Sequence, residues 1–187
     1  LEIPNIQFHY APAMIVDHGR TLLWGTGMSC HSCLLRPKSL GEVTLASADP
    51  FADPLIDPKF LSHPDDMKDM VEGYKIMMKV LGSEPFSKYI SEHTQRPIDI
   101  NDDADIEQAM REGADTVYHP VGTCKMGHDD MSVVDSMLKV HKVKGLRVVD
   151  ASIMPTIVGG NTNAPTIMIG EKASDMILKD WNILQSA

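Results

Sequence analysis

Glycine, proline and asparagine are concentrated in two stretches of residues 118–176, and this concentration limits what the chain can fold into. The first stretch, residues 118–127, has the sequence YHPVGTCKMG, in which a single histidine, His119, directly precedes a proline. The second, residues 159–166, has the sequence GGNTNAPT and runs into an amphipathic helical pattern. Glycine and proline at this density predict loops of fixed shape from which a few polar side chains converge. We therefore expect the functional site here.

The length and composition of the chain are those of a soluble globular protein. Its 187 residues are 43% hydrophobic, which is enough to build a core. No apolar run approaches the roughly 20 residues that span a bilayer, and no charged and then apolar leader opens the sequence. A net charge of −9 argues against a nucleic-acid role, because phosphate binding needs a basic face. The sequence opens without methionine in a strand-like pattern, so we expect a piece of a longer protein.

The cysteines are Cys30, Cys33 and Cys124, an odd number that is unlike a secreted disulfide scaffold. We expect a cytoplasmic protein and leave open a peripheral association with the inner face of the membrane. An alternative is a zinc site formed by these cysteines and His128, or a redox pair formed by Cys30 and Cys33. Residues three apart in a strand point to opposite faces, and the second pair of ligands is distant in sequence. We therefore expect no metal.

The first two thirds of the chain predict antiparallel strands followed by helices. Extended patterns at residues 5–10, 25–35 and 42–46 predict strands, and the Pro- and Gly-containing turn at 36–41 predicts that the last two form a hairpin. A short strand is expected at 55–56. Capping signals predict helices over 62–82 and 103–112. The first helix is rich in methionine, which suits core packing or, alternatively, a lipid-facing or partner-binding surface.

The last part of the chain predicts a strand, a loop and a helix. The apolar run at 146–150 predicts a buried strand that ends in Asp150. The final helix should begin near Asn163, with Pro165 in its first turn. Its expected buried residues are Ile167, Met168, Ile169, Ala173, Met176 and Ile177. The whole pattern predicts an α+β fold, an antiparallel sheet covered by helices and followed by a strand-loop-helix tail.

Several motifs together resemble one family, the glucose-methanol-choline (GMC) flavin oxidoreductases, over nearly the whole chain. The motifs are the two stretches above, LRVVDASIMP at 146–155, and upstream NIQFH, LRPKSLGEV and LIDP. The chain is most similar to family members that act on choline or on aliphatic primary alcohols. The family's Gly-x-Gly-x-x-Gly motif is absent, since GTG at 25–27 lacks the third glycine. The resemblance implies that residues 1–145 belong to the substrate-binding domain. It also implies that residues 146–187 form the tail that returns to an FAD-binding Rossmann domain absent from this chain.

The resemblance also implies roles for individual residues. His119 corresponds to the base that removes the hydroxyl proton, and Asn161 to the partner of the substrate oxygen, a position that some members fill with a second histidine. Simpler structural interpretations are a non-catalytic histidine, a turn asparagine at 161 and a helix cap at Asn163. The implied FAD contacts are Asp150, Ala151, Asn163, Ala164, Pro165 and Thr166. Tyr118 and Val121 are expected to contact the substrate.

The implied reaction is FAD-dependent oxidation of a primary alcohol, either choline or an aliphatic alcohol, to an aldehyde by hydride transfer to flavin N5. FAD is expected in the intact enzyme, whereas this part alone is expected to be inactive and not to retain the flavin. The expected partners are the missing FAD domain, a small alcohol and an electron acceptor that the sequence leaves open. An alternative is a stand-alone, non-catalytic module that binds a small alcohol or cationic ligand in the same pocket.

Overall fold

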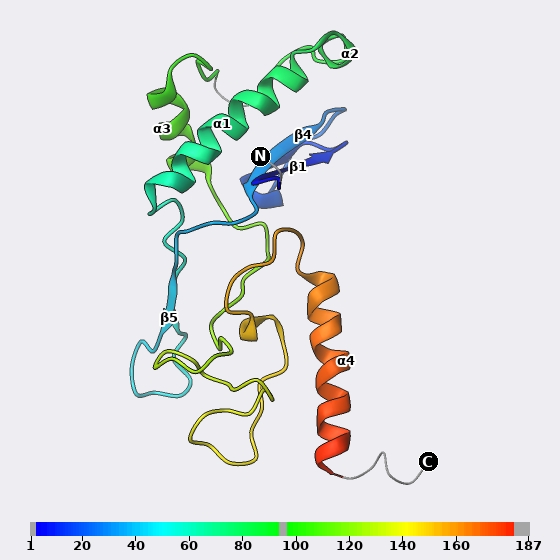
Figure 1. Cartoon of the computed structure of the whole chain (residues 1–187). Coiled ribbons are helices and arrows are strands. Elements are labelled where there is room, and N and C mark those ends of the chain that lie inside the picture. Colours follow the sequence, from blue (N-terminus) through cyan, green and yellow to red (C-terminus); the bar gives the residue numbers. More distant parts are fainter. Residues whose placement is uncertain (1–2, 94–96, 182–187) are drawn as a thin grey trace. The chain divides into compact units, whose positions relative to one another are not determined.

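A computed structural model describes residues 3–93 and 97–181, except the side chains of residues 18 and 22. The chain forms two compact units, Leu1–Val117 and Tyr118–Ala187, and each is described by itself (Figure 1). In the described part of the chain, no helix has both the length and the apolar character needed to cross a membrane.

The described residues of the first unit form three two-stranded antiparallel sheets. Strand β1 (Ile6–Ala11) pairs with β4 (Ser29–Leu34), and β5 (Glu42–Thr44) pairs with β6 (Leu55–Asp57). Between β1 and β4 lies a small hairpin that sequence analysis missed. It consists of β2 (Ile15–Val16), the 3-10 turn η1 (Asp17–Gly19) and β3 (Thr21–Leu22). The predicted hairpin of residues 25–35 with 42–46 is therefore wrong.

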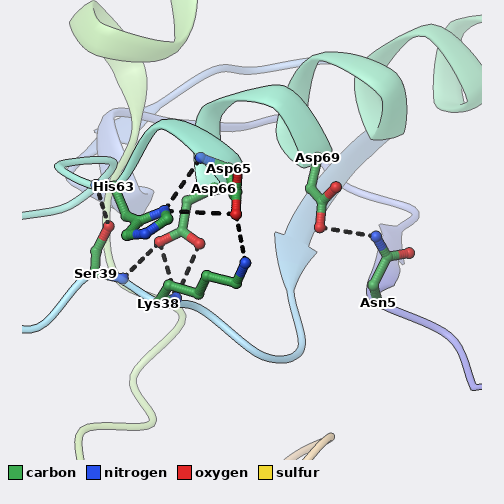
Figure 2. Close-up of polar contacts among 7 residues, drawn as sticks. All are labelled: Asn5, Lys38, Ser39, His63, Asp65, Asp66 and Asp69. Carbon is green, nitrogen blue, oxygen red and sulfur yellow. Dashed lines mark hydrogen bonds and ion pairs between the residues drawn. The ribbon is translucent and has the colours of Figure 1, made fainter.

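Buried Asp66 explains why the 36–41 turn does not make that hairpin. The residue is only 3% exposed, and its carboxylate accepts the backbone N–H of Lys38 at 2.9 and 3.1 Å and that of Ser39 at 2.8 Å. Ser39 Oγ in turn accepts the backbone N–H of His63 at 3.0 Å, and Lys38 Nζ pairs with Asp65 (Figure 2). The segment after β4 is thus bound to the start of the first helix and does not fold back on β4.

This helix, α1 (Pro64–Leu81), lies between α3 and the β1–β4 pair (Figure 1). His63 caps it by accepting the backbone N–H of Asp65, and Gly82 follows its last residue. A single turn, α2 (Glu84–Ser87), was not predicted, whereas α3 (Asp103–Gly113) was. The core of this unit contains Met67, Val71, Ile106 and Met110. Met77 is also buried, so two methionines of α1 face the interior.

The β5–β6 hairpin contrasts with this core, because every residue of both strands is exposed. Leu45 and Phe51, which lie in the segment between the strands, are 86% and 94% exposed. The hairpin therefore presents an apolar surface.

The second unit has a core between irregular segments and one long helix, α4 (Asn163–Asp180). Isolated bridges such as Met126↔Val134 and Lys139↔Arg147 connect the segments. A 3-10 turn, η2 (Ala151–Ile153), precedes the loop that leads to α4. The core residues are Val134, Leu138, Ile153, Met154, Ile169 and Ala173.

Two expectations for this unit are wrong. Residues 146–150 form no strand, because an apolar run becomes a strand only along a paired neighbour and here Arg147 alone forms a bridge. In α4, Ile169 and Ala173 are buried and Met176 is half-buried, but Ile167 and Met168 are 58% and 54% exposed. Successive helical residues turn by about 100°, so these two lie off the buried stripe.

Candidate active site

The loop that carries His119 is held by backbone conformation and by bonds to η2. Tyr118 and Gly122 have φ angles of +64° and +89°, and a side chain at 122 would lie 3.4 Å from the carbonyl oxygen of Met154. Glycine adopts a positive φ without strain, which explains why residue 122 of the motif is a glycine. The backbone N–H of Cys124 donates to Ser152 at 3.0 Å, and that of Met126 donates to Ile153 at 2.8 Å. The histidine loop and η2 therefore form one fixed substructure.

Both ring nitrogens of His119 contact residues of the loop before α4. Nε2 lies 2.8 Å from Asn161 Nδ2, and Nδ1 lies 2.9 Å from Thr162 Oγ1. His119 is half-buried, Asn161 is exposed and Thr162 is only 7% exposed. The structure thus brings together His119 and Asn161, the two residues expected to act on the substrate.

The first turn of α4 has an exposed positive end. Its N-cap residue, Thr162, makes no side-chain capping bond, and the first turn holds no acidic residue. The first N–H groups of a helix have no partner within it and carry a partial positive charge. Asn163 and Ala164 are exposed, while Pro165 and Thr166 are half-buried. This end of the helix suits a negatively charged or electron-rich group.

The other predicted site residues lie around this centre in different environments. Asp150 is exposed and caps η2 by accepting the backbone N–H of Ser152 at 2.8 Å. Ala151 and Val121 are half-buried and pack against the core of the second unit. Tyr118 is 68% exposed. Of Tyr118 and Val121, the two residues expected to contact the substrate, Tyr118 therefore is the more accessible.

Thr162 is the contact that sequence analysis missed. A threonine directly before a helix predicts a capping hydroxyl, so the motif gave no reason to pair it with His119. A usable signal was present, because Thr162 directly follows Asn161 and both had to lie in the same loop.

Cys30 and Cys33 are the residues of the alternative zinc or redox site. Cys30 and Cys33 are three apart in β4 and so point to opposite faces, and burial raises the pKa of both thiols. Cys33 Sγ lies 3.4 Å from His9 Nε2. Within residues 3–93 and 97–181, no three histidine, cysteine or acidic side chains are grouped to hold a metal ion.

Comparison with known proteins places this chain in a family. Residues 37–170 match the GMC oxidoreductase family. The alcohol dehydrogenase [acceptor] of Pseudomonas putida is 47% identical over 176 residues, which are 94% of this chain and 32% of that protein. The oxygen-dependent choline dehydrogenase of Klebsiella pneumoniae is 42% identical over 174 residues, 93% of this chain and 31% of that protein. The chain belongs to the GMC oxidoreductase family.

A solved structure agrees with this assignment. A variant of formate oxidase from Aspergillus oryzae RIB40, made to study FAD modification, is 31% identical and superposes with a TM-score of 0.89. The match covers 98% of this chain and 33% of the formate oxidase, and it confirms the predicted α+β class. The chain spans about a third of the length of the curated relatives it matches.

Proposed function

We propose that this chain is the C-terminal part of an FAD-dependent enzyme that oxidises a primary alcohol to an aldehyde, with His119 as the base. The observation that carries the proposal is the pair of contacts to the His119 ring, 2.8 Å from Asn161 and 2.9 Å from Thr162. The chain also belongs to a family whose members include an alcohol dehydrogenase and a choline dehydrogenase.

In the proposed reaction, the hydroxyl oxygen of the alcohol lies within hydrogen-bond reach of His119 Nε2. The Nε2 lone pair accepts the hydroxyl proton, which is the task that histidine performs near neutral pH. The Asn161 amide donates a hydrogen bond to the same oxygen as its negative charge develops, and an amide does this without titrating. FAD, when bound, supplies the acceptor for the hydride that leaves the carbon, and the oxygen and carbon are left as the aldehyde group.

The residues present fit a flavin beside this centre. The uncapped start of α4 has no acidic side chain in its first turn, so its N–H groups suit the negative charge of a reduced flavin ring. We place residues 163–166 at that ring, and Asp150 with Ala151 along the ribityl and pyrophosphate part.

The substrate-binding domain would end at residue 145, with 146–187 as the tail of the FAD domain. The compact units of the structure divide elsewhere, between Val117 and Tyr118. Because the chain spans about a third of its relatives and lacks the Gly-x-Gly-x-x-Gly motif, we expect it to be inactive and without flavin when isolated. Because the relatives include both an alcohol dehydrogenase and a choline dehydrogenase, choline and other alcohols are both candidate substrates. We place Tyr118 nearest to the bound substrate.

The test uses the protein encoded by the complete reading frame. Choline, short alcohols and long alcohols are added in turn under anaerobic conditions while visible absorption is recorded. A flavin spectrum that one alcohol bleaches is the expected result, and it identifies the substrate class at the same time. A preparation that holds no flavin and cannot be reconstituted with FAD would contradict the proposal and favour a non-catalytic binding module.

A further inference from the structure

Thr162 occupies an unusual position between His119 and helix α4. The residue is only 7% exposed, and its hydroxyl lies 2.9 Å from His119 Nδ1. A threonine at an N-cap normally accepts a backbone N–H from the first turn of its helix. Here no such bond forms, although Thr162 still accepts the backbone N–H of Thr166 on its carbonyl oxygen at 3.0 Å. The hydroxyl is therefore directed to the imidazole and not to the helix.

The contacts of the ring fit one of its two neutral tautomers. The amide nitrogen of Asn161, 2.8 Å from Nε2, can only donate, so Nε2 must present its lone pair. In a neutral imidazole the other nitrogen then holds the hydrogen, and Nδ1–H donates to Thr162 Oγ1. This is the tautomer that a base acting through Nε2 requires.

We propose that Thr162 is a positioning residue that holds His119 in the tautomer with a free Nε2 lone pair. The proposal rests on the proposed function of His119. The role of Thr162 differs from that of Asn161, because the threonine oxygen accepts Nδ1–H both before and after Nε2 takes a proton. The Asn161 amide donates to Nε2 only while that nitrogen is unprotonated, so this contact is lost once Nε2 has taken the proton. The Thr162 contact therefore persists through the proton transfer.

Two substitutions separate this role from simple packing. Thr162→Val keeps the branched shape in a buried position but removes the acceptor, whereas Thr162→Ser keeps the hydroxyl and removes a methyl group. If packing alone mattered, the serine variant would be the more damaged of the two. Thr156→Val makes the same hydroxyl-to-methyl change at an exposed position of the same unit and is the matched control.

The first measurement is the rate of anaerobic flavin reduction by the substrate alcohol in the full-length protein. Thr162→Val should lower this rate on the order of 10- to 100-fold, the loss seen when the orienting partner of a metal-bound histidine is removed. The flavin content and the apparent dissociation constant of the alcohol should not change. Thr162→Ser should stay within about threefold of the natural protein, because the acceptor remains. A valine variant with the natural rate, or a serine variant slower than the valine variant, would overturn the proposal.

The second measurement needs no activity. Nitrogen NMR of full-length protein labelled with ring-15N histidine distinguishes a protonated from an unprotonated ring nitrogen, and His119→Gln assigns the signals. At alkaline pH, Nδ1 of His119 should carry the proton in the natural protein and in Thr162→Ser, and the population should shift to Nε2–H in Thr162→Val. An Nε2–H tautomer in the natural protein, or no shift in Thr162→Val, refutes the positioning role. If the tautomer shifts as expected but no alcohol reduces the flavin, the positioning role is retained and the proposed function fails.

Discussion

The side chains of His119 and Asn161 meet at 2.8 Å although the residues are 42 positions apart in the sequence. Each belongs to a Gly-rich loop, and backbone bonds from Cys124 and Met126 to the η2 segment hold the histidine loop in place. The amide thus faces the nitrogen that we propose as the base.

Replacing His119 with glutamine should remove most of the turnover of the full-length enzyme and leave its flavin bound. A positioned base contributes about 10²- to 10⁴-fold, so a loss in that range is expected for flavin reduction by the alcohol. The exposed His128 in the same unit is the matched control, and His128→Gln should keep the natural rate. Near-natural turnover in His119→Gln would disprove the assignment of the base.

Asn161→Ala should be less damaging than His119→Gln, because it removes an oxyanion donor and leaves the base in place. The expected loss in the rate of flavin reduction is on the order of 10²-fold. Asn161→Asp has nearly the same shape but places a carboxylate beside the developing negative charge, so its loss should be larger than that of the alanine variant. An aspartate variant faster than the alanine variant would show that Asn161 does not donate to the substrate oxygen.

Asp66→Ala should destabilise the start of α1 and the 38–39 segment together. The change leaves the backbone N–H groups of Lys38 and Ser39 without their acceptor. We expect the free energy of local opening to fall by roughly 3 kcal/mol. Hydrogen–deuterium exchange of peptides that cover 38–39 and 63–70 measures this free energy of local opening. Asp65→Ala, in the same turn but exposed, should leave the exchange nearly unchanged because exposed ion pairs contribute little.

Asp66 should also make this region sensitive to acid. Burial raises the pKa of its carboxyl, but hydrogen bonds from Ser39 and from the Lys38 backbone outweigh burial and hold the pKa below its ordinary value. The stabilisation is therefore complete above the ordinary pKa of about 3.9. It is lost as the pH falls from there through the lower folded-state value, because the unfolded chain takes up the proton first. Between pH 6 and 3, the free energy of local opening should fall more steeply with decreasing pH in the natural protein than in Asp66→Asn. Equal slopes would contradict this role.

Elements with local signals were predictable from the sequence. Helix start and stop signals and helical periodicity identified α1, α3 and α4 to within a few residues, since these signals act on their own helix. Strand pairing was not predictable, because the partner of residues 42–44 depends on Asp66 binding the preceding turn. The exposure of Ile167 shows the same limit within a helix, since the apolar pattern alone does not fix where the buried face ends.

The candidate site depended on a different kind of information. Spacing alone could not bring His119 and Asn161 together, and the family motif supplied that expectation. The contact of Thr162 with His119 was missed because threonine before a helix ordinarily caps it. The roles of the flavin and substrate residues remain predictions.

The exposed β5–β6 hairpin determines how this protein should be handled in the laboratory. Side chains such as Phe51, 94% exposed, form an apolar surface of the kind that draws other molecules to it. A preparation of these 187 residues alone should bind hydrophobic dyes and self-associate as its concentration rises. If dye binding disappears in the full-length protein, other parts of that protein bury this apolar surface. Purification should then start from the full-length protein.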